Sequence, residues 1–125
     1  MRTVLAPERI VVRLVILESP YAGEVEANLA YARAALRDSL SRGEAPIASH
    51  LLYTQPGVLD DLVPEERTLG IAAGLAWRDK ADAAVFYVDR GWSRGMLEAR
   101  ALYEREGKPW DERRLTPNAD ASSTS

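Results

Sequence analysis

The chain has no cysteine, and His50 is its one histidine among 125 residues. Lack of cysteine excludes a disulfide framework and thiolate-bound metal sites. One imidazole is too few for a histidine-rich metal centre. An all-carboxylate magnesium site stays open. We expect the protein to work without a metal or an organic cofactor.

An excess of positive charge is also missing. The formal net charge is -3, the pI is about 5.2, and the arginines and lysines are scattered along the chain. A protein that binds the phosphate backbone of nucleic acid needs a basic face. A nucleic-acid polymer is therefore not an expected partner, whereas a nucleotide-sized anion needs only one or two of these basic side chains.

Long apolar runs are absent as well. No stretch approaches the ~18 residues of a transmembrane helix, so we expect no membrane partner. The apolar N-terminal segment is broken by Arg13 and lacks the cleavage site of a signal peptide. We interpret residues 1–9 as a short leader and expect a cytoplasmic protein. The chain has no Walker loop and no G-x-G-x-x-G after its first apolar run, which gives ATP hydrolysis and ordinary dinucleotide binding no support.

What the sequence does contain is an alternation of short apolar runs with amphipathic segments. Runs without strict alternation predict strands buried on both faces, and apolar spacings of three and four predict helices. One expected helix opens at Pro64, ends at Asp79 and Lys80, and has a face of small residues that allows close packing. The other expected helices are residues 24–41 and 93–105, and the expected strands are residues 10–17, 45–53 and 83–88, with a charged edge strand at 109–115.

Strands that alternate with helices in this way predict the α/β class. We expect a single-domain, Rossmann-like three-layer sandwich, with a mostly parallel sheet of four to five strands and helices on both faces. The domain should cover residues 10–115. Residues 116–125 are small and polar, and we expect them to form a disordered tail.

The turn after the third expected strand lies where open α/β sheets bind ligands. In one interpretation, Ser93 and the backbone near Gly95 hold an anion or a hydroxyl at the start of a helix, and Glu98 points into a pocket. In the other, Ser93 is an N-cap, Gly95 allows tight packing and Glu98 is a solvated acid. The candidate residues of this turn are Asp89, Trp92, Ser93, Gly95, Met96 and Glu98.

A second candidate loop follows the first expected strand and runs from Glu18 to Tyr21, with Ser19, Pro20 and Tyr21 as its candidate site residues. It either cups a sugar or a phosphate, with Tyr21 as a hydrogen-bond donor or stacking face, or is a plain turn into a helix. His50 lies in an apolar run. It is either a structural residue or a contact for the ligand. Trp92 lines a pocket or belongs to the core.

Several segments together resemble the nucleoside 2-deoxyribosyltransferase-like superfamily. They are ESPYAG, APIASHLLYTQPG, PEERTLGIAAGLAW, ADAAVFYVD and GWSRGMLEA, in this order and at this spacing. Within the superfamily, the chain is most similar to small uncharacterised bacterial and phage domains of the DUF4406 and DUF7768 kind. The resemblance covers about residues 11–115.

The enzymes of this superfamily cleave the N-glycosidic bond of deoxynucleosides or their monophosphates. The resemblance implies that Glu98 attacks or stabilises the anomeric carbon, with Ser93 and Gly95 at the 5′ end of the ligand. It places Ser19 and Pro20 where the first loop touches the sugar. It also implies a homo-oligomer, since such enzymes often complete their site across subunits.

Two features depart from the pattern of these enzymes. They carry a tyrosine inside the first strand, where this chain is apolar near Ile16, and Tyr21 comes later. They also use an aspartate on the helix before the third strand to handle the nucleobase, whereas residues 70–76 contain no acid here. His50, Glu66 or Asp89 are the candidates to replace it.

We expect a protein that binds a nucleoside or nucleotide and cleaves or transfers at an N-glycosidic bond. Glu98 would be the nucleophile, Ser93 and Gly95 the anion contact, and Tyr21 a wall or a donor. One alternative is a non-catalytic nucleotide-binding sensor or regulatory module on the same fold. Another is a structural, oligomeric protein with a vestigial pocket.

Overall fold

The computed structural model describes residues 12–116. The predicted leader, the start of the first expected strand and the predicted tail beyond Thr116 lie outside these residues. In chain order the elements are β1 (Arg13–Glu18), α1 (Val25–Ser41), β2 (Glu44–Ile47), α2 (Ser49–Leu52), α3 (Pro64–Ala76), the 3-10 turn η2 (Trp77–Asp79), β3 (Ala83–Tyr87), α4 (Arg94–Arg105) and β4 (Trp110–Arg113).

The four strands form one parallel sheet in the order β2-β1-β3-β4. β1 lies between β2 and β3, with Val15 opposite both Pro46 and Ala83. The α/β class, the parallel sheet and the short charged edge strand at the C-terminal end are confirmed. In such a sheet the carboxyl ends of all strands point to the same side, where ligands usually bind.

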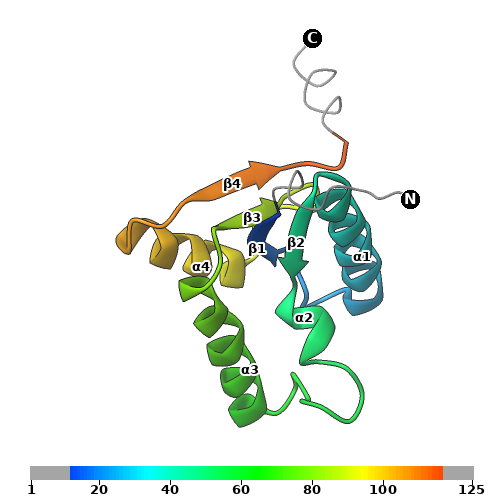
Figure 1. Cartoon of the computed structure of the whole chain (residues 1–125). Helices are drawn as coiled ribbons and strands as arrows, with labels where there is room; N and C mark the ends of the chain where they lie inside the picture. The colour runs from blue at the N-terminus through cyan, green and yellow to red at the C-terminus, as the bar shows by residue number, and fades with distance from the viewer. Residues whose placement is uncertain (1–11, 117–125) are drawn as a thin grey trace, which may run out of the picture.

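Helices cover both faces of the sheet, as predicted (Figure 1). Side chains alternate between the two faces along each strand. On one face Val15, Leu17, Val85 and Tyr87 pack with Ala35 of α1. On the other face Ile16, Ala84 and Phe86 pack with three residues of α4, which are Met96, Ala99 and Tyr103.

The prediction of a strand over residues 45–53 is wrong in its second half. β2 ends at Ile47, and Ser49–Leu52 form the short helix α2. Beyond Ile47 the run has no β-branched residue, and alanine and leucine favour a helix. The backbone amide of Tyr53 then bonds to the carbonyl of Ser49 at 2.8 Å. This turn places His50 at the carboxyl end of β2.

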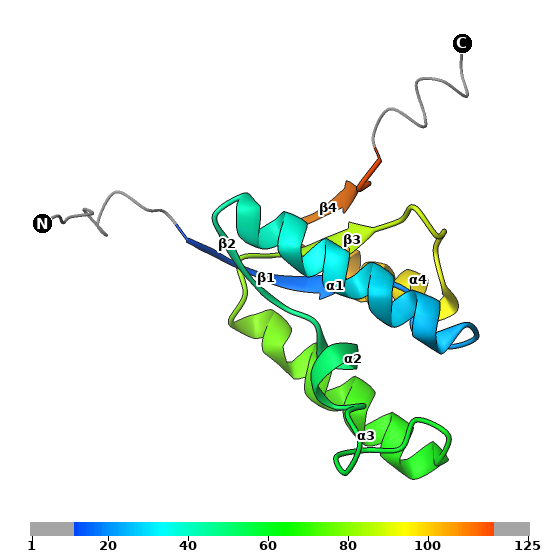
Figure 2. The ribbon, with the colours of Figure 1, turned by 90° about the vertical axis from the view of Figure 1, so that its right-hand side faces the viewer.

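Helix α3 packs closely through Gly74, and its larger residue Leu75 also contacts the core. A Cβ atom at Gly74 would lie 2.7 Å from Oγ of Ser49, so α2 and α3 approach too closely for any other residue there. Gly74 is the buried residue of α3, while Leu69, Ala72 and Ala76 are exposed. The apolar face predicted for this helix therefore points away from the domain, and Figure 2 shows α3 slanting away from the sheet.

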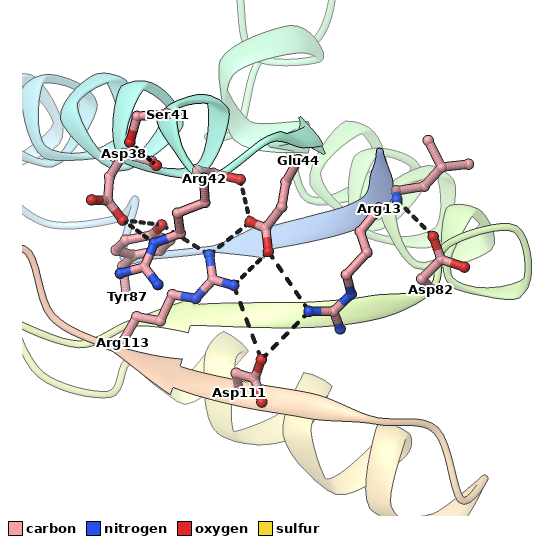
Figure 3. Close-up of polar contacts among 11 residues, drawn as sticks. Arg13, Asp38, Ser41, Arg42, Glu44, Asp82, Tyr87, Asp111 and Arg113 are labelled. Carbon is pink, nitrogen blue, oxygen red and sulfur yellow. Dashed lines mark hydrogen bonds and ion pairs between the residues drawn. The ribbon is translucent and has the colours of Figure 1, made fainter. Parts of the chain in front are cut away.

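A buried ion pair joins the two edge strands on the α1 side of the sheet (Figure 3). The guanidinium of Arg113 on β4 donates two hydrogen bonds, of 2.8 and 2.6 Å, to the carboxylate of Glu44 on β2. The two side chains are only 8% and 7% exposed. Ser39 donates a further bond to Glu44, and the Tyr87 hydroxyl accepts one from Arg113. Bidentate charged bonds of this kind are strong and directional.

Replacement of Arg113 by methionine should lower the free energy of unfolding by about 3–5 kcal/mol, because Glu44 then stays buried without its partner. The double variant Arg113→Met/Glu44→Met should recover most of that loss. Hydrogen bonds from Arg113 hold the pKa of Glu44 below its usual 4.5. The ionised carboxylate therefore contributes to the stability of the folded wild-type protein, and this contribution should be lost as the pH falls below 4.5. Urea unfolding from pH 3 to 7 measures both effects, and equal midpoints for the two variants would contradict the role of the pair.

Candidate functional site

A cavity of about 290 Å³ opens at the carboxyl ends of β1 and β3. Its lining includes Glu18 and Ser19 from the end of β1 and His50 from α2. Gly70, Ile71 and Gly74 of α3 and the first turns of α4 complete it. We call this space the central cavity. The sheet order explains the assembly, because β1 and β3 are neighbours and the segments that follow them meet at one edge.

Ser93 caps α4 at the edge of the central cavity. Its hydroxyl oxygen accepts a hydrogen bond of 3.2 Å from the backbone amide of Met96, so the predicted N-cap is confirmed. The amide of Leu97 bonds to the Ser93 carbonyl at 3.0 Å. The amides of Arg94 and Gly95 precede the first intrahelical bonds. They leave a helix N-terminus that favours an anion at the cavity edge.

Gly95 lines the same space without a packing reason to be glycine. A Cβ atom built there meets nothing within 4 Å, and its backbone φ is not in the left-handed region. The interpretation that Gly95 exists for tight packing is therefore wrong. The missing side chain keeps the start of α4 open toward the cavity.

Glu98 lies in the cavity lining one turn further along α4. Its side chain is 66% exposed and pairs with Arg94 at 3.2 Å, while Arg94 itself is 93% exposed. An ion pair between such exposed side chains is weak. The carboxylate therefore stands at the mouth of the cavity and can exchange Arg94 for a ligand.

Ser19 and His50 form a hydrogen-bonded pair across the β1 and β2 ends. Ser19 Oγ and His50 Nε2 lie 2.8 Å apart. Burial lowers the pKa of His50 to about 4, so the imidazole is neutral at pH 7. Tyr21 meets the His50 ring edge-on at 6.3 Å between ring centroids. A neutral imidazole and a hydroxyl can both donate and accept hydrogen bonds, which suits sugar hydroxyls or a base edge.

Tyr21 also borders a second, more open hollow of about 570 Å³, which lies between the loop after β1 and residues 54–62. Both spaces share Tyr21, Thr54 and Leu59 in their linings. Tyr21 therefore stands between a small inner space and a wider outer one.

Glu18 is a functional candidate that the sequence analysis missed. It is the last residue of β1, and two-residue alternation places it on the same face as Ile16, toward α4. Among the described residues its carboxyl group makes no side-chain hydrogen bond or ion pair. Burial raises its pKa to about 7. The sequence contained an indication of this position, because Glu18 is an acid at the end of a mostly apolar strand. Two-residue alternation along the strand places it on an inward-facing position.

Asn28 holds the two loops that flank the central cavity. Its amide donates to the carbonyls of Tyr21 and Ala22 at 3.0 and 3.1 Å. Its side-chain oxygen accepts a bond of 2.7 Å from Arg90 in the loop after β3. One buried amide thus fixes the loop after β1 to the loop after β3.

Three sequence candidates lie outside the cavity lining. The carboxylate of Asp89 accepts hydrogen bonds from Tyr31, Leu115 and Thr116. Burial alone would raise its pKa, but these bonds lower the pKa to about 2. Trp92 packs on Phe86 and Trp110 with ring centroids 5.1 and 6.1 Å away, and Pro20 is buried beside the site. Of the two interpretations of Trp92, the one in which it belongs to the core therefore agrees with its position.

Comparison with known proteins gives one match. A family model described as "Domain of unknown function (DUF7768)" covers residues 13–113. No curated protein and no solved structure matches the chain. Within residues 12–116, no three histidine, aspartate or glutamate side chains come together to hold a metal ion. In the same range no helix has the length and apolarity to cross a membrane.

Replacement of Glu18 by glutamine should change the pH dependence of stability. The unfolded chain releases the Glu18 proton near pH 4.5, whereas the folded protein keeps it until about pH 7. Relative to the variant, the wild-type protein should therefore lose stability as the pH rises from 4.5 to 7, while the lowered pKa of His50 acts equally on both proteins. Thermal midpoints from pH 4 to 8 measure the gap in stability between the wild-type protein and Glu18→Gln. Glu104→Gln, on the exposed side of α4, is the control. A gap that is constant over this range would contradict a raised pKa.

Proposed function

Because the chain belongs to the DUF7768 family, whose description assigns no activity, we propose a function from the geometry of its central cavity. The protein binds a nucleoside or nucleotide and cleaves or transfers at its N-glycosidic bond. The observation that carries the proposal is the meeting of a carboxylate, an open helix N-terminus and a polar Ser19–His50 pair around one small space. A cavity of about 290 Å³ is near the lower end of the pockets that bind small ligands.

The α4 side of the cavity suits the 5′ end of such a ligand. The amides of Arg94 and Gly95 and the hydroxyl of Ser93 would bind a phosphate or a 5′-hydroxyl. The space beside Gly95 lets that group approach the backbone. Arg94 supplies a mobile positive charge at the same place, since its side chain is 93% exposed.

Glu98 is the nucleophile in this proposal. Its carboxylate attacks the anomeric carbon, and the bonding pair of the glycosidic bond leaves with a nitrogen of the base, which takes up a proton. Water or a second base then attacks the glycosyl ester and frees Glu98. A carboxylate in this position also stabilises the positive charge that develops on the sugar.

The resemblance to the nucleoside 2-deoxyribosyltransferase-like superfamily supports this proposal through the S-x-G-x-x-E turn. The base side must differ, because residues 70–76 of α3 contribute Gly70, Ile71, Gly74 and Leu75 to the lining and no acid, while the α3 acid in the lining is Glu66 in the first turn of the helix. We therefore infer an apolar wall for the base where the related enzymes have an aspartate.

A non-catalytic nucleotide-binding module is the second candidate function. The observation that favours it is the 66% exposure of the Glu98 side chain, which pairs with Arg94 among the described residues. A nucleophile is usually held by more than one contact. Ligand binding without release of base would support this candidate.

We also infer that a second copy of the chain covers the outer face of α3. Leu69 is 59% exposed, Trp77 is 42% exposed, and Ala72 and Ala76 continue this face along the helix. Leu69, Ala72 and Ala76 fall three and four apart, so they form one stripe, and Trp77 follows at its end. Small side chains in the stripe allow the helices of two copies to approach closely.

The substitution Glu98→Gln should lower base release by at least ~10³-fold, because an amide is a poor nucleophile for the anomeric carbon. The assay incubates the four 2′-deoxynucleoside 5′-monophosphates with the protein and separates free base by chromatography. Glu104→Gln, on an exposed turn of the same helix, should keep wild-type turnover. Full activity of Glu98→Gln would show that the carboxylate has no chemical role.

The substitution Leu69→Glu should convert the assembly into monomers, because it places a charge in the apolar stripe of α3. Thr68→Glu adds the same charge at the neighbouring exposed position and should leave the assembly unchanged. Light scattering coupled to size-exclusion chromatography gives the mass of each variant. A monomeric wild-type protein would contradict the inference.

A further inference from the structure

Glu18 lies at the end of β1 that borders the central cavity. β1 is an inner strand, and Glu18 pairs with Phe86 of β3 at its carboxyl end. The side chain leaves the sheet on the α4 face and lines the central cavity. Glu98 lines the same cavity at its mouth, so two carboxyl groups reach one space from different elements.

The surroundings of Glu18 are mostly apolar. Leu75 of α3 and Met96 and Ala99 of α4 line the cavity on this side of the sheet. No ion pair of Glu18 occurs within the described chain. The carboxyl group is therefore partly buried and has no ion-pair partner among the described residues.

The polar and charged groups that face this space come from three elements. His50 approaches from α2, where it is neutral and bonded to Ser19. Glu66 and Arg67 of α3 lie in the lining, as do Arg94 and Glu98 of α4. Asp61 belongs to the loop before α3 and pairs with Arg67 at 2.9 Å.

Tyr103 of α4 gives a second, independent observation. Its side chain is 1% exposed, and its hydroxyl is buried with no hydrogen-bond partner among the described residues. Burial and then the charge of nearby Glu18 raise the pKa of Tyr103. The two groups therefore interact electrostatically, although the unpaired hydroxyl donates no hydrogen bond to Glu18.

We propose that the Glu18 carboxylic acid protonates the departing nucleobase while Glu98 attacks the sugar. This role rests on the function proposed above and supplies an acid in place of the one that residues 70–76 of α3 lack. The two carboxyl groups lie in contrasting environments, Glu18 sheltered at the sheet and Glu98 exposed at the mouth. Such contrast is how one site assigns an acid and a nucleophile.

The steps balance with water as the only other reactant. The proton moves from the Glu18 oxygen to a nitrogen of the base, and the electron pair of the broken C–N bond goes to the base. A bond forms between the anomeric carbon and a Glu98 oxygen. Water then attacks that carbon, gives its proton to the Glu18 carboxylate and releases Glu98. Glu18 thus returns to its acid form in each cycle.

The pKa of about 7 suits this work. An acid with a pKa near the working pH is present in its protonated form and still gives up the proton readily. The rate should therefore fall as the pH rises above 7, because the carboxylate form cannot donate. His50 adds no second titration there, since its pKa is about 4.

The test compares two leaving bases in the variant Glu18→Gln. One probe is 2′-deoxyguanosine 5′-monophosphate, and the other is its N7-methylated form, whose positively charged base leaves without accepting a proton. Glu18→Gln should lower kcat/KM for the unmethylated probe by about 10²–10⁴-fold and for the methylated probe by less than ~10-fold. Glu98→Gln should lower both.

The outcomes separate the two proposals. One outcome is guanine release that depends on Glu98 while Glu18→Gln affects both probes equally. That result would overturn the role of Glu18 and leave the proposed function intact. No release from either probe by the wild-type protein would overturn both. A carbon-13 NMR titration of Glu18 gives a readout without turnover, and a midpoint near 4.5 instead of about 7 would also overturn the proposal.

Discussion

The buried pair between Arg113 and Glu44 is the interaction on which the arrangement of the sheet depends. It joins β4 to β2, the two edge strands, across the α1 face of the sheet. With both edges tied on that face, β1 and β3 stay in the middle, and the loops that follow them stay side by side. Asn28 then fixes these two loops to each other. The central cavity is the space that remains between them and α3.

The two faces of the sheet differ in chemistry. On the α1 side, buried polar groups satisfy one another, as in the contacts of Tyr87 with Asp38 and Arg113. On the α4 side the packing is apolar up to the last residue of β1, where Glu18 has neither a salt bridge nor a side-chain hydrogen bond within the described chain. A satisfied network stabilises a fold, whereas an unpaired buried acid destabilises it at neutral pH. This contrast is why we place the proposed chemistry on the α4 side.

Much of this fold could be predicted from the sequence, because the periodic signals were strong. β1, α1, β3 and α4 begin and end close to the predicted residues, and Ser93 caps α4 as its position indicates. The errors arose where tertiary contacts decide. The contact of Gly74 with Ser49 favours a helix after β2, and periodicity alone does not tell which face of α3 meets the domain. Glu18 was not predicted as a site residue because an acid between a strand and a proline-containing turn is typical of the turn itself, and its place in the cavity lining depends on how α3 and α4 pack.

The two edges of the sheet also determine how the protein meets other chains. Pro46 lies within β2 and has no backbone N–H to donate, and β4 carries Asp111, Glu112 and Arg113 in its four residues. Proline and charge on short edge strands discourage the addition of a further strand from a neighbour. The sheet is thereby protected against edge-to-edge aggregation and amyloid-like growth. The self-association that we propose therefore uses a helical surface, the outer face of α3, and no strand edge.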